Sequence, residues 1–217
     1  MIIINKIVLK HMYKSIDTNP ILNDVNLELQ SGTIYGFIGQ NGSGKTMLFR
    51  IMAGLVRPSE GSVKYYINNN ERNINDVSKG VMIENAELYP ELSAFENLDC
   101  LASINKKISK KEIKEILCRL GFDSKNHKKY CKYSLGMRHR LVFAQAVMEK
   151  PDVILLDEPT NALDEESVHL IRDMIKDEKE RGAIICVASH NKEDISILCD
   201  KIFSINNHNV TKMAEME

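Results

Sequence analysis

The sequence lacks several features that mark whole classes of protein. No apolar run approaches the roughly 18 residues that a membrane-spanning helix needs, and the first residues, MIIINKIVLKHMY, show no small-residue cleavage site of a secretory leader. The five cysteines are odd in number and show no CxxC spacing, which argues against a disulfide framework and against a zinc site. We therefore expect a reduced, cytoplasmic setting, in which work at a membrane would need a separate anchor.

The chain also lacks a surplus of charge of either sign. Lys and Arg number 29 and Asp and Glu 30, so the formal net charge is -1 and gives no global attraction to nucleic acid. The one dense basic run, KNHKKYCK at 125–132, is expected to be a solvated loop. We expect no nucleic-acid partner. With 217 residues, the chain is long enough for one domain with a full core and a lobe inserted into it.

What the sequence does contain is a change of pattern along its length. The first third predicts strands, at residues 2–9, 25–29, 33–38 and 62–67. The middle part carries two capping boxes that predict helix starts, SAFE at Ser93–Glu96 and SKKE at Ser109–Glu112. We interpret residues 87–147 as a helical lobe that interrupts the core, although its first helices could instead be ordinary helices that cover the sheet.

The last third predicts a parallel sheet. VILLD at 153–157 and AIICVAS at 183–189 are near-continuous apolar runs, as strands buried on both faces are. Between them, Glu165–Glu180 predicts a helix that is closed by Gly182. Strands that alternate with helices are typical of a parallel sheet covered on both sides, so the predicted fold class is α/β.

A glycine-rich loop carries the strongest chemical signal. GQNGSGKT follows the strand TIYGFI, matches G-x-x-x-x-G-K-[ST] at every fixed position, and opens the helix KTMLFRIMAGL. Glycines let successive N–H groups point at phosphate oxygens, and the helix dipole adds positive potential. Lys45 adds a full charge for the β and γ phosphates, and Thr46 can place its hydroxyl on Mg²⁺. The candidate phosphate-binding residues are Gly39, Gln40, Asn41, Gly42, Ser43, Gly44, Lys45 and Thr46.

Acidic residues and a histidine follow the two buried runs. Asp157 ends the first run and suits Mg²⁺, while Glu158 next to it can accept a proton from an attacking water. Acids at the end of a buried strand are costly unless something cationic compensates them. His190, at the end of the second run, can donate to the γ-phosphate and steer water. These residues predict a nucleoside triphosphate with Mg²⁺, and Lys45, Glu158 and His190 are the candidate catalytic residues.

The stretch KYSLGMRHRL opens a helix with Ser134 and Gly136. A serine at a helix start caps free backbone N–H groups and a nearby glycine relaxes the backbone, so the simplest interpretation is a cap. The three basic residues that follow are expected to form the solvated or partner-facing side of the helix. These residues are Arg138, His139 and Arg140.

In their order, these motifs resemble the ATP-binding subunit of an ABC transporter over nearly the whole chain. VMIENAELYPELSAFENL lies where the family has its Q-loop and helical lobe, and YSLGM lies where it usually has LSGGQ. VILLDEP carries the acid pair, TNALD is the D-loop, and His190 stands at the switch histidine. The resemblance implies a P-loop NTPase core with a parallel sheet, an N-terminal antiparallel β-subdomain and an inserted α-helical subdomain. We expect a single domain over 1–217, in which 1–86 and 148–217 form the core and β-subdomain and 87–147 the helical subdomain.

The resemblance also implies roles for residues whose own signal is weaker. It places Tyr13 against the adenine of ATP, and it places Ser134 and Gly136 against the γ-phosphate of an ATP held by a second copy of the chain. Glu84 occupies the place of the usual Q-loop glutamine, which touches Mg²⁺ or the attacking water. A carboxylate there adds negative charge beside the metal and removes the amide donors.

At two places the sequence departs from the usual family pattern, and both variants resemble those of peptide-antibiotic exporters of the bacitracin- and lantibiotic-resistance type. These departures are IEN at the Q-loop, and SLGM in the signature, where Leu135 and Met137 replace Gly and Gln. The resemblance implies an ATP-hydrolysing subunit that powers a separate membrane permease and exports a peptide antibiotic or a similar amphipathic compound. Two copies, most simply a homodimer, would close around two ATP molecules. Such a subunit is cytoplasmic and peripheral on the inner face of the cell membrane through its permease.

Other functions compete with this one. A soluble ATPase of the same superfamily, acting on a non-transport partner, generally carries a second cassette, a long coiled coil or a basic arm, and we find none in this sequence. A P-loop small-molecule kinase needs an Arg-rich lid, which Arg138–Arg140 could imitate. A nucleotide-binding protein without catalysis is disfavoured, because Lys45, Asp157, Glu158 and His190 are all present.

Overall fold

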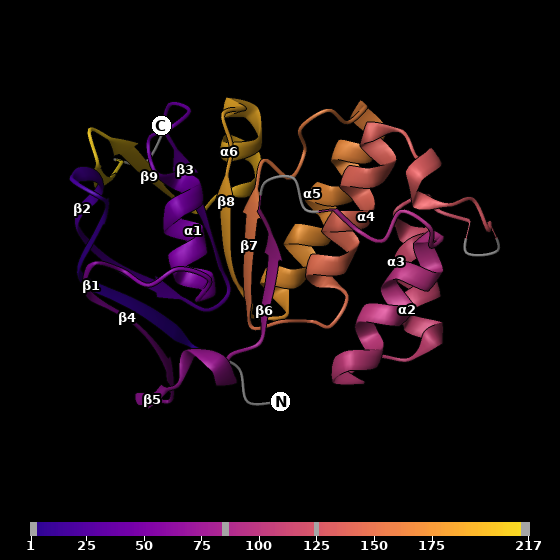
Figure 1. The fold of residues 1–217 in the computed structure, drawn as a ribbon, viewed down its shortest axis with the longest axis horizontal. Helices are drawn as coiled ribbons and strands as arrows, with labels where there is room; N and C mark the ends of the chain where they lie inside the picture. The colour runs from indigo at the N-terminus through magenta and orange to yellow at the C-terminus, as the bar shows by residue number, and fades with distance from the viewer. Residues whose placement is uncertain (1–3, 84–86, 124–125, 214–217) are drawn as a thin grey trace.

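A computed structural model describes residues 4–83, 87–123 and 126–213 (Figure 1). Its elements in chain order are β1 (Lys6–Ile16), β2 (Asn19–Gln30), β3 (Thr33–Ile38), α1 (Lys45–Ala53), β4 (Glu60–Ile67), β5 (Asn70–Arg72), the 3-10 turn η1 (Ile74–Asp76), β6 (Lys79–Met82), α2 (Ala94–Asn105), α3 (Lys110–Arg119), the 3-10 turn η2 (Tyr130–Lys132), α4 (Leu135–Val147), β7 (Val153–Asp157), α5 (Glu165–Glu180), β8 (Ile184–Ala188), α6 (Lys192–Leu198), β9 (Lys201–Asn206) and β10 (Asn209–Lys212). The predicted strand VILLD and the predicted helix Glu165–Glu180 are confirmed residue for residue.

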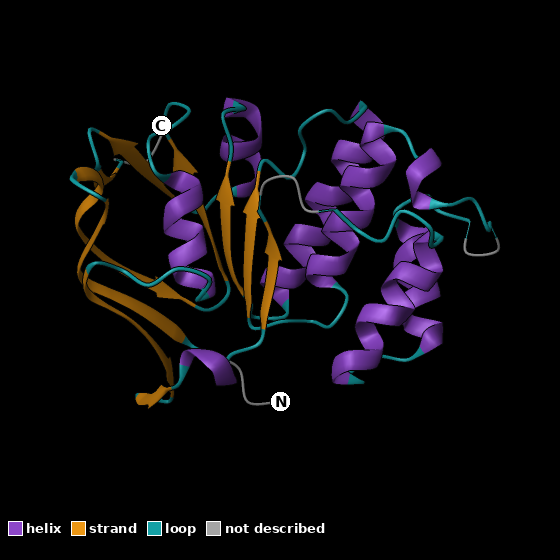
Figure 2. Cartoon of the chain, viewed as in Figure 1, coloured by secondary structure: helices purple, strands orange, loops and turns teal. Residues whose placement is uncertain are grey.

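The strands form two sheets (Figure 2). One is antiparallel, with the order β2-β1-β4-β5, and the other has the order β10-β9-β3-β8-β7-β6. Strands β9, β3, β8, β7 and β6 run parallel, and β10 joins the edge antiparallel to β9. This arrangement confirms the predicted α/β class, with a parallel core and an antiparallel sheet built from the first third of the chain.

Apolar clusters cover both faces of the parallel sheet. α1 lies between the two sheets in Figure 1, and its Phe49 belongs to one cluster with Leu155 of β7. On the other face, Phe143 of α4 and Ile171 of α5 belong to a second cluster with Ile154 of β7. Successive side chains of a strand point to opposite faces, so β7 feeds both clusters in turn. Burial on both faces is the reason that its sequence is apolar at nearly every position.

Helices α2 and α3 lie at the end of the molecule away from the antiparallel sheet (Figures 1 and 2). Both begin with the predicted capping boxes. The Ser93 hydroxyl accepts from the Glu96 N–H and the Glu96 carboxylate accepts from the Ser93 N–H, and Ser109 and Glu112 repeat this exchange. α4 packs against α2 and α3 and also against β6 and β7. The division of the chain at 87–147 stays a prediction.

The first two strands differ from their predicted bounds. β1 runs to Ile16 where the pattern predicted an end at residue 9, and β2 starts at Asn19 where the pattern predicted residue 25. The pairing of β1 with β2 shifts register between Leu9 and Met12 and again between Met12 and Lys14. Such bulges break the alternation of apolar and polar residues, so the sequence reveals only the regular parts of the two strands.

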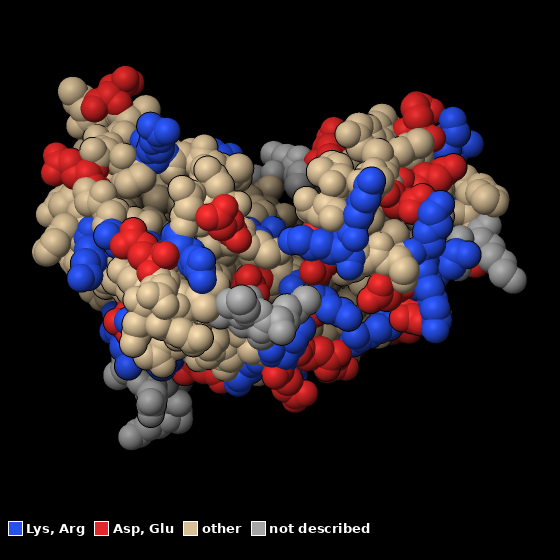
Figure 3. Space-filling view, turned by 90° about the horizontal axis from the view of Figure 1, so that it is seen from below, with Lys and Arg blue, Asp and Glu red and all other residues tan. Residues whose placement is uncertain are grey.

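Charges of both signs cover the surface. On the face shown in Figure 3, Lys and Arg side chains lie among Asp and Glu side chains. In the helical region, Lys129 lies 3.0 Å from Glu91 and Lys110 lies 3.2 Å from Asp99. Exposed pairs of this kind contribute little to stability. Within the described part of the chain, no helix has the length and apolar character required to cross a membrane.

Candidate functional site

Three neighbouring parallel strands bring the predicted site residues to one edge of the sheet. The glycine-rich loop follows β3, Asp157 ends β7, and Ser189 and His190 follow β8. In the sheet register, Asp157 lies beside Ala188, and Ala188 lies beside Phe37 of β3. The carboxyl ends of parallel strands form the usual ligand crevice of an open α/β sheet. The predicted residues therefore converge because of the strand order.

The glycine-rich loop wraps around the amino group of Lys45. Its Nζ donates to the carbonyl oxygen of Gly39 at 2.7 Å and to that of Gln40 at 3.2 Å. Gly42 and Gly44 have φ of 80° and 107°, a region that favours glycine. Gly44 is the N-cap of α1, supplies no side-chain cap, and is followed by no acidic residue in the first turn. The first N–H groups of α1 and the dipole of this helix suit an anion such as phosphate.

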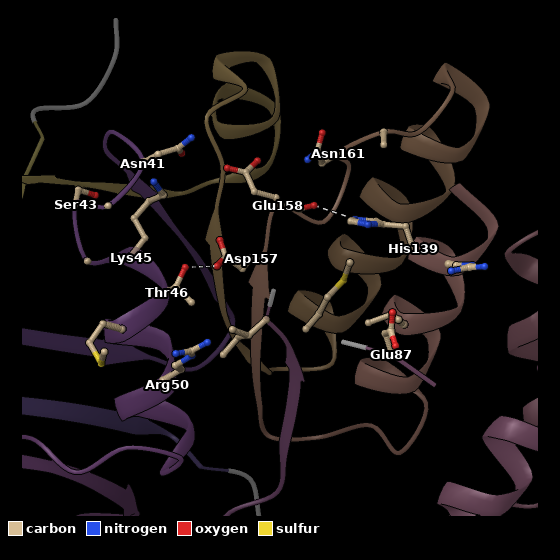
Figure 4. Close-up of a pocket in the computed structure, with 18 of the residues that line it drawn as sticks. Asn41, Ser43, Lys45, Thr46, Arg50, Glu87, His139, Asp157, Glu158 and Asn161 are labelled. Carbon is tan, nitrogen blue, oxygen red and sulfur yellow. Dashed lines mark hydrogen bonds between the residues drawn. The ribbon is translucent and has the colours of Figure 1, made fainter. Parts of the chain in front are cut away.

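Thr46 and Asp157 form the candidate metal site (Figure 4). The Thr46 Oγ1 donates to Oδ2 of Asp157 at 2.6 Å. A hydroxyl and a carboxylate supply the hard oxygen ligands that Mg²⁺ prefers, and Mg²⁺ takes further ligands from water and substrate phosphates. This donor set fits Mg²⁺ bound together with a polyphosphate on the glycine-rich loop.

Glu158 lies between the ends of β7 and β8. Its carboxylate accepts from the backbone N–H of His190 at 3.0 Å and from the Ser189 hydroxyl at 3.4 Å. The Nδ1 of His190 lies 2.8 Å from the same carboxylate, and the two side chains keep 65% and 23% exposure for His190 and Glu158. Both therefore reach solvent. A carboxylate beside an imidazole can take a proton from a water molecule and orient that water.

The start of α4 is a helix cap, as predicted. The Ser134 Oγ accepts from the backbone N–H of Met137 at 3.2 Å. Gly136 lies near the loop after β7, since a Cβ at this glycine would lie 3.5 Å from the carbonyl oxygen of Ala162. Leu135 is 67% exposed. The expected contact of Ser134 and Gly136 with a phosphate stays a prediction.

The arginines after this cap correct the solvated part of the expectation, since they make contacts within their own chain; a partner-facing role stays a prediction. Arg138 donates to the carbonyl oxygen of Cys131 at 2.9 Å, and Arg140 donates to that of Leu120 at 3.0 Å. Each guanidinium also lies over an aromatic ring of its own chain, at 5.3 Å and 5.4 Å from the ring centres. Both arginines are half-buried. The planar guanidinium of arginine can pack on an aromatic ring while it keeps its charge and its hydrogen bonds.

His139 is also half-buried, against the same expectation. Its Nε2 lies 2.9 Å from the carbonyl oxygen of Glu158, as the dashed line in Figure 4 shows. Burial lowers the pKa of His139, and hydrogen bonds to the backbone of Glu158 and Pro159 oppose this shift. The histidine and the glutamate are 19 residues apart. Local sequence signals do not reveal this contact.

Lys45, Thr46, Asp157, Glu158 and His139 line one cavity of 920 Å³ (Figure 4). The glycine-rich loop and α1 line one side, Asp157 and Glu158 lie at the sheet edge, and residues of α4 line the opposite side. The volume lies within the range of roughly 300–1,000 Å³ that is usual for small-molecule sites. Arg50 and Glu87 also line the cavity, although no motif in the sequence singles them out.

Some predicted residues lie outside the described cavity lining. The predicted residues that are not among the described lining residues are Tyr13, Gly39, Gln40, Ser134, Gly136 and His190. Tyr13 lies on β1, where desolvation and the charge of Asp24, its hydrogen-bond partner, raise its pKa. Glu84 lies outside the described residues. Its assignment to the metal or the attacking water stays a prediction.

Comparisons with known proteins point to one family. A model of the family described as ABC transporter matches residues 22–161. The chain is 44% identical over 197 residues to the uncharacterized ABC transporter ATP-binding protein YybJ of Bacillus subtilis (strain 168), covering 90% of each chain. It is 35% identical to the bacitracin transport ATP-binding protein BcrA of Enterococcus faecalis, covering 89% of this chain and 64% of BcrA. Among solved structures, the dimeric structure of MJ0796, a bacterial ABC transporter cassette, gives a TM-score of 0.82 at 26% identity, over 97% of this chain and 100% of that chain.

Proposed function

The chain belongs to the ABC transporter ATP-binding family, and from this premise we propose that it binds and hydrolyses ATP to power a separate membrane permease. The observation that carries the proposal is the sheet edge, where Lys45, the Thr46–Asp157 pair and Glu158 line one cavity and His190 lies against the Glu158 carboxylate. The similarity to BcrA supports a permease that exports a peptide antibiotic or a similar amphipathic compound. The protein would be cytoplasmic and peripheral on the inner face of the membrane through this permease.

The triphosphate lies on the glycine-rich loop in this proposal. Lys45 already points its ammonium group across the loop, where it holds the carbonyl oxygens of Gly39 and Gln40. It then adds its charge to the β and γ phosphates, while the first turn of α1 donates backbone N–H groups. Thr46 and Asp157 hold Mg²⁺, which when bound neutralises charge on the phosphate oxygens.

Glu158 acts as the base in hydrolysis. It accepts a proton from a water whose oxygen bonds to the γ-phosphorus, and the bond from this phosphorus to the bridging oxygen breaks. The products are ADP and inorganic phosphate. His190 uses Nδ1 toward Glu158 and thereby leaves Nε2 for the γ-phosphate.

A second copy of the chain completes the site in this proposal. MJ0796 is described as dimeric, and the exposed start of α4 is a helix N-terminus that suits an anion. Ser134 and Gly136 of one copy then meet the γ-phosphate held by Lys45 of the other. Tyr13 stacks on the adenine, and Glu84 touches the metal or the attacking water. The simplest assembly is a homodimer.

The substitution Glu158→Gln tests hydrolysis, because it keeps the shape of the side chain and removes the base. We expect ATP turnover to fall by at least about a hundredfold, and we expect the variant with ATP to form a dimer in size-exclusion chromatography with light scattering. Glu166→Gln is the matched control, since Glu166 is an exposed acid in the first turn of α5. Turnover at the wild-type rate in Glu158→Gln, or a monomer with ATP, contradicts the proposal.

A second experiment tests the permease. The protein is expected to co-purify with a membrane protein encoded by a neighbouring gene that contains several apolar spans of about 20 residues. Cells that express both proteins should resist a peptide antibiotic, and the Glu158→Gln variant should abolish this resistance. Association with a soluble partner in place of a membrane protein supports instead a soluble ATPase of the same superfamily.

A further inference from the structure

Glu158 has a backbone conformation that needs support from its surroundings. Its φ is 53°, in the left-handed region that residues other than glycine seldom adopt. The backbone N–H of Glu158 donates to the carbonyl oxygen of Ala188 at 2.8 Å, and its carbonyl oxygen accepts from the N–H of Asn161 at 3.2 Å. The side chain is held by Ser189 and His190. The direction of the carboxylate therefore depends on how firmly the backbone of this one residue is fixed.

The carbonyl oxygen of Glu158 has a second donor, His139 of α4. The distance from Nε2 to this oxygen is 2.9 Å, and the ring points from α4 toward the end of β7 in Figure 4. A carbonyl oxygen can only accept, so Nε2 carries the hydrogen. α4 packs against α5, β6 and β7, which gives the ring a rigid base.

The environment of His139 favours a neutral ring. Burial lowers its pKa, and hydrogen bonds to the backbone of Glu158 and Pro159 oppose this shift. A neutral imidazole with a hydrogen on Nε2 offers one donor in a defined direction. A glutamine amide offers a neutral donor at a similar reach and is therefore a conservative replacement.

We propose that His139 is a positioning residue for hydrolysis, because its Nε2–H fixes the Glu158 carbonyl oxygen and thereby aims the Glu158 carboxylate at the attacking water. The inference rests on the proposed function, in which Glu158 is the base. His139 itself takes no proton from the water. Ser134 is the N-cap of α4, the helix proposed to meet the partner's ATP. The bond from His139 therefore joins this helix to Glu158, the base that acts on this chain's own ATP.

Steady-state ATP hydrolysis by three variants tests this inference. His139→Leu removes the donor, and His139→Gln restores it. His169→Leu is the control, since His169 is an exposed histidine on α5. Thermal unfolding and the affinity for ATP are measured on each variant. If His139→Leu does not fold, His139→Asn takes its place, because its shorter amide does not reach the carbonyl oxygen.

We expect kcat of His139→Leu to fall by about tenfold, with KM for ATP unchanged within about twofold. His139→Gln should regain most of the wild-type kcat, and His169→Leu should match the wild type. The inference is overturned if His139→Leu hydrolyses ATP as fast as His169→Leu, if His139→Gln is as slow as His139→Leu, or if the loss appears in KM alone. A wild-type protein that hydrolyses no ATP refutes the proposed function itself, whereas normal hydrolysis that depends on Glu158 but not on His139 refutes this inference alone.

Discussion

The two sides of the cavity are built differently. At the sheet edge, polar groups find partners within the chain, since Lys45 binds loop carbonyls and Glu158 binds His190. At the start of α4, Ser134 and Leu135 are exposed, and the Ser134 hydroxyl caps the first turn by accepting from the backbone N–H of Met137. The sheet edge is therefore organised in advance by one chain. The start of α4 presents a helix N-terminus whose ligand, in the proposed function, belongs to another copy.

The largest expected effect concerns the buried ion pair behind the sheet edge. Arg172 donates to Oδ1 of Asp194 from Nε at 2.8 Å and from Nη2 at 2.6 Å, and the Thr160 hydroxyl donates to the other oxygen of Asp194. Asp194 is fully buried. Arg172→Met leaves this carboxylate without its cation, so the free energy of unfolding should fall by about 3–5 kcal/mol in urea denaturation.

A surface ion pair provides the control for this prediction. Arg119 and Asp177 lie 2.5 Å apart and are both about half exposed. Arg119→Met should lower the free energy of unfolding by no more than about 1 kcal/mol. Equal losses for the two variants would mean that the buried Arg172–Asp194 pair contributes no more to stability than an exposed pair.

The next largest effect is expected at Lys45, where a substitution removes the positive charge that faces the phosphates. Lys45→Ala should weaken the binding of ATP with Mg²⁺ by about a hundredfold, because hydrogen bonds from a charged donor are among the strongest. Isothermal titration calorimetry measures this affinity. Lys64→Ala is the control, since Lys64 is a surface lysine on β4 that pairs with Glu71. Unchanged affinity in Lys45→Ala would place the phosphates elsewhere.

A smaller effect separates the two roles of Ser134. Ser134→Ala and Ser109→Ala each remove a helix N-cap, and each should lower the free energy of unfolding by about 1 kcal/mol. Ser134→Ala should also slow ATP hydrolysis while a single chain keeps its ATP affinity, because the lost hydroxyl serves the other copy. If the two variants hydrolyse ATP at the same rate, Ser134 is a helix cap and nothing more.

The smallest effect is expected at Leu135. Its side chain is 67% exposed, so Leu135→Gln should change the free energy of unfolding by no more than about 0.5 kcal/mol. Leu55, which is 68% exposed just after the C-cap of α1, gives a matched Leu55→Gln control. Urea denaturation measures both. A loss well above that of the control would show that the start of α4 packs within its own chain and is not free for a partner.

Much of the fold could be predicted because its signals are local. The bounds of α5, the two capping boxes and the glycine-rich loop each depend on a few neighbouring residues. Strands β6 and β9 were not predicted, since they form by pairing with β7 and β3, which lie far away in the sequence. Strand β10, a short partner of the neighbouring β9, was not predicted either. Short strands of this kind carry little pattern of their own.

The candidate site likewise contains residues that local motifs predict and contacts that only the packing of the chain reveals. Lys45, Asp157, Glu158 and His190 were predicted because motif and strand end coincide, and the parallel strand order brings them together. The contact of His139 with Glu158 was missed, because it depends on how α4 packs against the end of β7. The Arg172–Asp194 pair was missed for the same reason, since it joins α5 to α6.

A mixing experiment tests whether one nucleotide lies between the sheet edge of one copy and α4 of another. Lys45→Ala disables the first side, and Ser134→Arg blocks the second, so neither variant alone should hydrolyse ATP. In an equal mixture, each mixed dimer contains one intact site, and activity should return to about a quarter of the wild-type level if copies pair at random. A mixture that forms mixed dimers yet stays inactive would contradict the shared site.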